Sequence, residues 1–149
     1  MAKKVIIGII LAVLLIAGIV GYNAYQNYVV KDLQVGLSKV SLNEITLSTT
    51  TIGVTLQVYN PSIVTAKVGS LEAGLAANGV PLARLKEAGF DVPPKQSVER
   101  DFNIKLSNID LGLSLINAIK NRQISWQVKG NYTMDLLFSH YMKEFDLVS

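Results

Sequence analysis

The chain has 149 residues, no cysteine and a formal net charge of +3 at pH 7. This length leaves room for one folded domain, and the lack of cysteine excludes disulfides, thiol nucleophiles and thiolate metal sites. Lys3 and Lys4 supply most of the excess positive charge, because residues 31–149 hold 12 basic and 11 acidic side chains. These charges are mixed in sign and form no basic stripe with interleaved aromatic residues, so nucleic acid is not an expected partner.

The N-terminal segment is apolar. No charged residue occurs in residues 5–30, and residues 5–21 form an unbroken apolar run of 17 residues, which corresponds to about 26 Å of helix. This is the short end of the range for a membrane span. We predict that residues 1–30 form a single signal-anchor transmembrane helix whose residues 5–28 contact the lipid bilayer.

Charged and aromatic residues at the two ends of this helix predict its place in the membrane. Lysines at the N-terminus favour a cytoplasmic location of that end, and tyrosine prefers the interface between lipid and water. The predicted interface residues are Lys3, Lys4, Tyr22, Tyr25 and Tyr28. We therefore expect a single-pass protein of the cell membrane with residues 31–149 outside the cytoplasm.

Two alternatives for this segment stay open. A cleaved signal peptide would normally have a shorter apolar core and an Ala-x-Ala-like site, whereas here Tyr-Asn-Ala-Tyr follows the run. Pairs of small residues four positions apart, Gly8 with Ala12 and Ala17 with Gly21, would also allow two such helices to dimerise.

Alternation of apolar and polar side chains dominates residues 31–149 and indicates strands with one buried face. Asn78-Gly79 predicts a tight turn between two strands. Residues 124–138 keep one register, which predicts a long strand that bends or bulges near Gly130. The number and spacing of the segments predict a mostly β fold, a two-sheet antiparallel β-sandwich of about seven strands that forms a domain over residues 31–149.

One segment has helical rather than strand periodicity. Ser107 is placed to cap a helix, and Asp110 suits the positive end of the helix dipole. Apolar residues then recur three and four positions apart, so we predict one α-helix over about residues 108–121. Across an incompletely closed sandwich, this helix could cover an apolar groove for lipid, although such residues more often form plain core. The groove would be lined by Leu111, Leu115 and Ile119.

Asn60, Pro61 and Ser62 follow the alternating run of residues 52–59. Pro61 has no amide hydrogen to donate to a strand ladder, and Asn60 can bond the backbone downstream of it in an Asx-turn. We interpret these three residues as a structural turn that ends the strand, in preference to a ligand site.

The sequence contains no pattern that indicates catalysis. His140 is the only histidine, and no carboxylate–histidine cluster, Gly-rich phosphate loop or metal-ligand spacing accompanies it. We therefore expect no enzymatic activity, no catalytic residue, no cofactor and no metal site. Asn131-Tyr132-Thr133 matches the acceptor pattern for N-glycosylation, but it lies within a predicted strand.

The order of these segments resembles the LEA-2 family (late embryogenesis abundant group 2), which carries the WHy (water stress and hypersensitive response) domain. The resemblance covers about residues 33–146. It rests on the strand that ends in Asn60-Pro61, the segment Leu71 to Ala83 around Asn78-Gly79, the loop at Pro93-Pro94, and the helix followed by Ile124 to Gly130. The family pattern often has Asn where this chain has Ser62, so a family role for that residue stays open.

The resemblance implies a folded sandwich without an enzymatic site and a link to protection against dehydration and other stresses. Single N-terminal anchors also occur in the family. We expect a membrane-anchored, extracytoplasmic member that binds client proteins or membrane surfaces. Two other functions stay open, namely a self-associating structural subunit of a surface filament or membrane assembly, and a lipid-binding domain.

Overall fold

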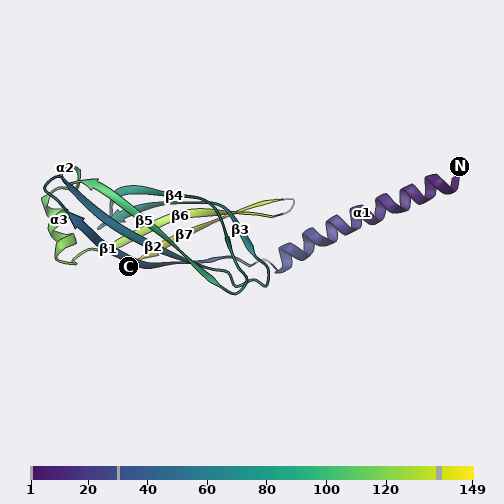
Figure 1. The fold of residues 1–149 in the computed structure, drawn as a ribbon, viewed down its shortest axis with the longest axis horizontal. Helices are drawn as coiled ribbons and strands as arrows, with labels where there is room; N and C mark the ends of the chain where they lie inside the picture. The colour runs from purple at the N-terminus through teal and green to yellow at the C-terminus, as the bar shows by residue number, and fades with distance from the viewer. Residues whose placement is uncertain (1, 30, 137–138) are drawn as a thin grey trace.

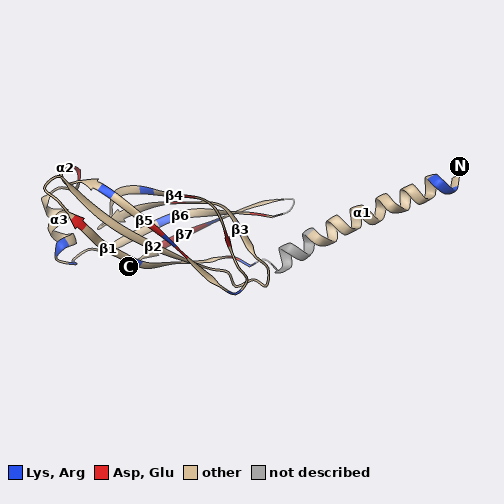
Figure 2. Cartoon of the chain, in the orientation of Figure 1, with Lys and Arg blue, Asp and Glu red and all other residues tan. Residues whose placement is uncertain are grey.

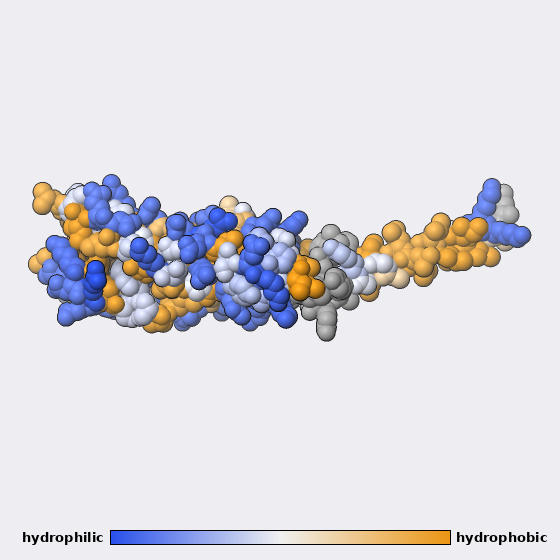
Figure 3. Space-filling model, turned by 60° about the horizontal axis from the view of Figure 1, so that its bottom comes forward, coloured by the Kyte–Doolittle hydropathy of each residue, from blue (hydrophilic) through white to orange (hydrophobic). Residues whose placement is uncertain are grey.

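The computed structural model describes residues 2–29, 31–136 and 139–149 of the chain, and the side chains of residues 23–29 lie outside the described part. Helix α1 (Ala2–Val29) has 28 residues, or about 42 Å at 1.5 Å per residue. Its stretch Ala2–Tyr22 is long and apolar enough to cross a membrane, and none of that stretch is buried. Figure 3 shows this helix as an apolar rod that projects from the rest of the molecule.

Seven strands in the described part of the chain form two antiparallel sheets, which confirms the predicted mostly β sandwich (Figure 1). The three-stranded sheet has the order β1-β2-β5, and the four-stranded sheet has the order β4-β3-β6-β7. The strands are β1 (Gln34–Ile45), β2 (Thr49–Tyr59), β3 (Ala66–Ala77), β4 (Val80–Val92), β5 (Ser97–Ser107), β6 (Trp126–Asp135) and β7 (His140–Val148).

The core lies between the two sheets and follows directly from the alternation in the sequence. Successive side chains of a strand point to opposite faces, so every second residue of β2 is buried. Strands β3 and β6 show the same alternation, apart from a change of phase at Gly69–Ser70 and the half-buried Gly130. The fully buried side chains of largest volume include Tyr132, Ile52, Leu56, Leu71 and Leu75. Burial of these faces against each other supplies the main driving force for folding.

The helical segment occurs where it is predicted, but it is not continuous. Gly112 has φ 79° and divides it into α2 (Asn108–Leu111) and α3 (Leu113–Lys120). Glycine adopts such a φ at little cost, and a regular helix cannot contain it. Ser107 precedes α2 as predicted, but its hydroxyl makes no capping hydrogen bond.

The prediction of one long strand over residues 124–138 is wrong. Strand β6 ends at Asp135, the amide of Leu136 donates to the carbonyl of Ser139, and β7 returns beside β6; Phe138 lies outside the described residues. The predicted bulge near Gly130 is also absent, because the register shift in this region lies in β3. A Cβ at Gly130 would lie 2.5 Å from the Cα of Ala73, so this glycine permits close approach of β3.

The sandwich has two ends with different structures (Figure 1). The proximal end lies next to α1 and consists of residues 31–33 with the loops 60–65 and 93–96, and the amide of Asn60 donates to the carbonyl of Gln96 there. The distal end consists of the β1–β2 turn, helices α2 and α3, and the segment 121–125 that leads into β6. There the amide of Asn108 donates to the carbonyl of Ser48.

Candidate functional site

Residues 31–33, the described residues between α1 and β1, are each bound to a different part of the proximal end. The amide of Lys31 donates to Oγ of Ser62 at 2.6 Å. The amide of Leu33 donates to the hydroxyl of Tyr132 at 3.0 Å, and the same hydroxyl lies 3.4 Å from the Leu33 carbonyl. Residues 31–33 are therefore held to the sandwich, and we call this segment the fixed junction and take it as the candidate functional site.

Asp32 makes the third set of contacts at this junction. Its carboxylate accepts a hydrogen bond from the hydroxyl of Tyr141 and lies 3.3 Å from Nζ of Lys143. Both partners belong to β7, whereas Ser62 belongs to the β2–β3 loop. The contacts with three separate elements thus tie residues 31–33 to the sandwich.

The turn at Asn60, Pro61 and Ser62 supports this junction from inside the protein. Asn60 and Ser62 are 0% and 1% exposed, so their polar groups require partners within the fold. The amide of Ser62 donates to Oδ1 of Asn60 at 2.9 Å, as in an Asx-turn. The Asn60 carboxamide also donates to the carbonyls of Val64 (2.8 Å) and Val92 (3.0 Å). The turn thus holds Ser62 where it can bind Lys31.

The electrostatics of the junction favour one protonation state. Burial raises the pKa of Tyr132 to about 12, since the ionised form would lose its hydration. The hydrogen bond from Tyr141, with a smaller contribution from Lys143, lowers the pKa of Asp32. The same hydrogen bond raises the pKa of Tyr141. At neutral pH both tyrosines therefore keep the protons with which they donate.

The predicted membrane-interface residues all belong to α1. Lys3 and Lys4 lie in its first turn and are exposed, and Tyr22 is 49% exposed at the end of the candidate span. The side chains of Tyr25 and Tyr28 lie outside the described residues. Figure 2 shows no charged residue along the described part of α1 beyond the two lysines.

Other residues singled out in the sequence do not join the junction. His140 is exposed, and its Nδ1 lies 3.0 Å from Oδ1 of Asp135. Asn131 lies in the middle of β6, a strand paired on both sides. Within residues 2–29, 31–136 and 139–149 no group of three metal-ligating side chains is found. The residues of the suggested lipid groove are core residues, with exposures of 5–9%: Leu111, Leu115 and Ile119.

Sequence reasoning missed the tyrosines that hold the junction. Tyr132 was recognised only as one apolar position in an alternating strand, and Tyr141 was not singled out. A signal for the first exists, because a buried tyrosine hydroxyl usually requires a hydrogen-bond partner. No pattern in the sequence identifies Leu33 as that partner, since 99 residues separate the two.

A candidate membrane span followed by a seven-stranded antiparallel sandwich in the described part of the chain defines the class of protein. The sequence profile described as "Late embryogenesis abundant protein" (LEA_2) matches residues 55–143, which is more than half of the chain. The chain therefore belongs to the LEA_2 family, as the order of its motifs predicts. The comparison with curated proteins finds no match.

Solved structures of low sequence identity share the fold. A protein of Arabidopsis thaliana superposes with a TM-score of 0.62 at 12% identity, over 80% of this chain and 81% of that chain. A protein described as a late embryogenesis abundant (LEA) protein superposes with a TM-score of 0.50 at 11% identity, over 87% of this chain and 78% of that chain. At these identities the superpositions show the shared fold alone.

Proposed function

We propose that this LEA_2 protein is a single-pass membrane protein whose sandwich lies outside the cytoplasm, against the bilayer surface. It protects nearby proteins or the membrane surface under stress, and it does so by non-covalent contact without enzymatic chemistry. The observation that carries the proposal is the fixed junction. Lys31, Asp32 and Leu33 are bound to the sandwich within a few residues of the end of α1, which keeps the sandwich close to the bilayer that the helix spans.

The charge distribution of α1 supports the proposed orientation. Positive side chains are unfavourable near the N-terminus of a helix, where they oppose the macrodipole by about 0.3–1 kcal/mol each. Lys3 and Lys4 occupy this position, and the first turn of α1 contains no acidic residue. The positive-inside rule explains why lysines occur there despite this cost, because lysines next to a membrane span favour a cytoplasmic location of that end.

The outer face of the three-stranded sheet supplies a surface for contact with clients. Polar side chains of neighbouring strands are linked across it, with Asn43 donating to Asn103 at 3.0 Å and Thr55 donating to Asp101 at 2.7 Å. These hydrogen bonds are exposed, and their amide, hydroxyl and carboxylate groups offer a partner both donors and acceptors. Such a surface suits weak, exchangeable contacts with many partners better than recognition of a single ligand.

The proposal is tested by reconstituting the full chain into phosphatidylcholine vesicles that also contain an external labile enzyme. The vesicles are dried or frozen, and two quantities are measured after recovery, the leakage of a trapped dye and the activity of the enzyme. An inert single-pass protein of similar size, at equal mass, is the control. We expect less leakage or higher enzyme recovery with the LEA_2 protein than with the control.

A variant with a flexible Gly/Ser segment inserted before Lys31 tests the role of the fixed junction. Protection of the bilayer should decrease in this variant, because the sandwich would no longer be held at the surface. Recovery equal to that of the inert protein in both measurements would overturn the proposed protective function. Protection that the insertion leaves unchanged would refute the link to the junction.

A further inference from the structure

The distal end contains a pocket that the proposed function does not use. Its volume is about 580 Å³, and it lies between β1 on one side and α3, the following loop and β6 on the other. The residues that line it are Lys39, Val40, Ser41, Leu42, Ile119, Lys120, Arg122, Ile124 and Trp126. Three of these side chains are cationic, none is acidic, and most of the others are apolar.

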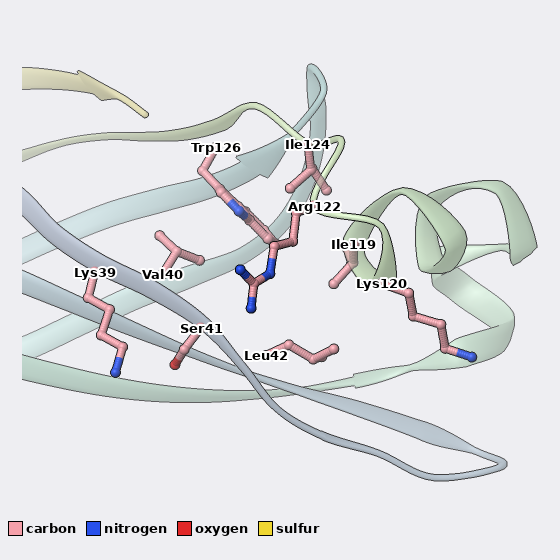
Figure 4. Close-up of a pocket in the computed structure, with 9 residues that line it drawn as sticks. All are labelled: Lys39, Val40, Ser41, Leu42, Ile119, Lys120, Arg122, Ile124 and Trp126. Carbon is pink, nitrogen blue, oxygen red and sulfur yellow. The ribbon is translucent and has the colours of Figure 1, made fainter.

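The three cations have no partner within the described part of the protein. None of Lys39, Lys120 and Arg122 takes part in an ion pair there, although other basic residues do. Figure 4 shows Arg122 between Lys39 and Lys120, whose ammonium groups lie at opposite ends of the pocket. Together the three exposed cations give the pocket a positive potential that attracts an anion. The wall formed by Ile124 and the buried Trp126 favours an apolar group next to that anion.

The backbone at Arg122 shows that its side chain is placed in the pocket at a conformational cost. Its φ is 56°, a left-handed conformation that is unfavourable for a residue with a Cβ. The amide of Arg122 donates to the carbonyl of Ile119, and the amide of Gln123 donates to that of Ala118. This pattern is a Schellman motif, in which glycine normally occupies the left-handed position. Figure 4 shows the guanidinium extending from this position towards β1.

Strand β1 is irregular on both sides of its pocket-lining stretch. Its register with β2 shifts between Leu37 and Lys39 and again between Leu42 and Glu44. Bulges redirect side chains and are frequent beside functional sites. Irregular backbone thus flanks the pocket-lining residues of β1, and it occurs at Arg122 in the opposite wall.

We propose that this pocket binds a small amphipathic anion. Its phosphate or carboxylate group binds Arg122, which can bind two oxygens at once, and Lys39 and Lys120 flank this position at the two ends of the pocket. Its apolar segment packs against Ile124 and Trp126. The site goes beyond the proposed protective function and requires neither the anchor nor the fixed junction.

The test uses Trp126, which is the only tryptophan and therefore reports on the pocket by its fluorescence. The full chain in phosphatidylcholine nanodiscs is titrated with hexyl phosphate, whose short chain keeps it monomeric in water. We expect a saturable change in fluorescence. Inorganic phosphate should bind more weakly, and hexyltrimethylammonium, which has the same chain and the opposite charge, should give no saturable change.

The variant Arg122→Gly separates binding from folding. Its affinity for hexyl phosphate should fall at least about tenfold through loss of a charged hydrogen-bonding group, while its unfolding temperature stays equal or rises because the left-handed position now holds glycine. Lys95→Gly is a matched control, since Lys95 also has a positive φ (57°) and lies in the proximal loop 93–96. Its affinity should equal that of the wild type.

A second arm distinguishes the sources of the anion. The protein-containing nanodiscs are sedimented with phosphatidylglycerol vesicles. Co-sedimentation that is lost in Arg122→Gly would identify the headgroup of an apposed membrane as a ligand. Binding of hexyl phosphate without co-sedimentation would identify soluble amphiphiles, and either result supports the site. No saturable response, an equal response to hexyltrimethylammonium, or unchanged affinity in Arg122→Gly would overturn it.

Discussion

Tyr132→Phe removes the single hydroxyl that binds Leu33 at the junction. The variant leaves the buried amide of Leu33 without its partner at 3.0 Å, and an unsatisfied buried donor costs about 1–3 kcal/mol. The phenylalanine ring fills the same space, so no cavity adds to this cost. We expect the free energy of unfolding at pH 8 to fall by about 2 kcal/mol.

High pH provides a second signature of the same hydroxyl. Burial raises the pKa of Tyr132 to about 12, whereas an unfolded tyrosine has a pKa of about 10. A pKa that is higher in the folded state contributes stability that is fully present below about pH 10 and is lost as the pH rises towards 12. The shift of about two units corresponds to about 3 kcal/mol. The difference in stability between wild type and variant should therefore narrow across this window.

The assay is urea unfolding of the full chain in detergent micelles, followed by Trp126 fluorescence between pH 8 and 11.5. Tyr59→Phe is the control, because Tyr59 is half-buried and its hydroxyl has no hydrogen bond with a described residue. Its stability should change by less than about 0.5 kcal/mol. A Tyr132→Phe variant as stable as the wild type at pH 8, or a difference that does not vary with pH, would refute the reasoning.

Two further substitutions test the packing of the sandwich by thermal or urea unfolding. Asn60→Ala removes a fully buried carboxamide that forms three hydrogen bonds and should lower the free energy of unfolding by about 3 kcal/mol; a loss below about 1 kcal/mol would contradict the role of this turn. Gly130→Ala drives a Cβ into the backbone of β3 and should cost about 3 kcal/mol or more. Gly74→Ala, where the nearest atom is 3.9 Å away, should cost less than about 1 kcal/mol, and equal losses in the two glycine variants would contradict the close approach at Gly130.

Much of the fold is predictable because alternation reports directly on a buried face. Every second residue of β2 is buried over Thr50 to Val58, which is the pattern that the sequence shows. The β6–β7 turn was missed because residues 136–139 read Leu-Leu-Phe-Ser, without the Gly, Pro, Asn or Asp that usually marks a turn. Gly112 is a sequence signal for the break in the helix, because a glycine destabilises a helix interior by about 1 kcal/mol relative to alanine.

The candidate site is predictable only where its contacts are local. The Asx-turn follows from the residue types at Asn60 and Ser62, which are two positions apart. The contact between Asp32 and Tyr141 spans 109 residues, so it depends on how β7 pairs with β6 and on where the chain leaves α1. The periodicity of the sequence determines neither this strand pairing nor the position at which the chain leaves α1. The pocket is not predictable for the same reason, because Lys39 and Arg122 line one pocket only after the sheets have packed.

The fixed junction makes a prediction about the distal pocket in the proposed membrane orientation. Lys39 and Leu42 lie five and eight residues after Gln34 in β1, which places the pocket roughly 17–27 Å from the junction at about 3.4 Å per residue. Charge screening has a Debye length of about 8 Å at 0.15 M salt. Phosphatidylglycerol added to the anchoring nanodisc should therefore leave the affinity of the pocket for hexyl phosphate unchanged at this salt concentration. A marked loss of affinity would mean that the pocket lies close to its own bilayer, which would contradict the proposed orientation with the distal end directed away from the membrane.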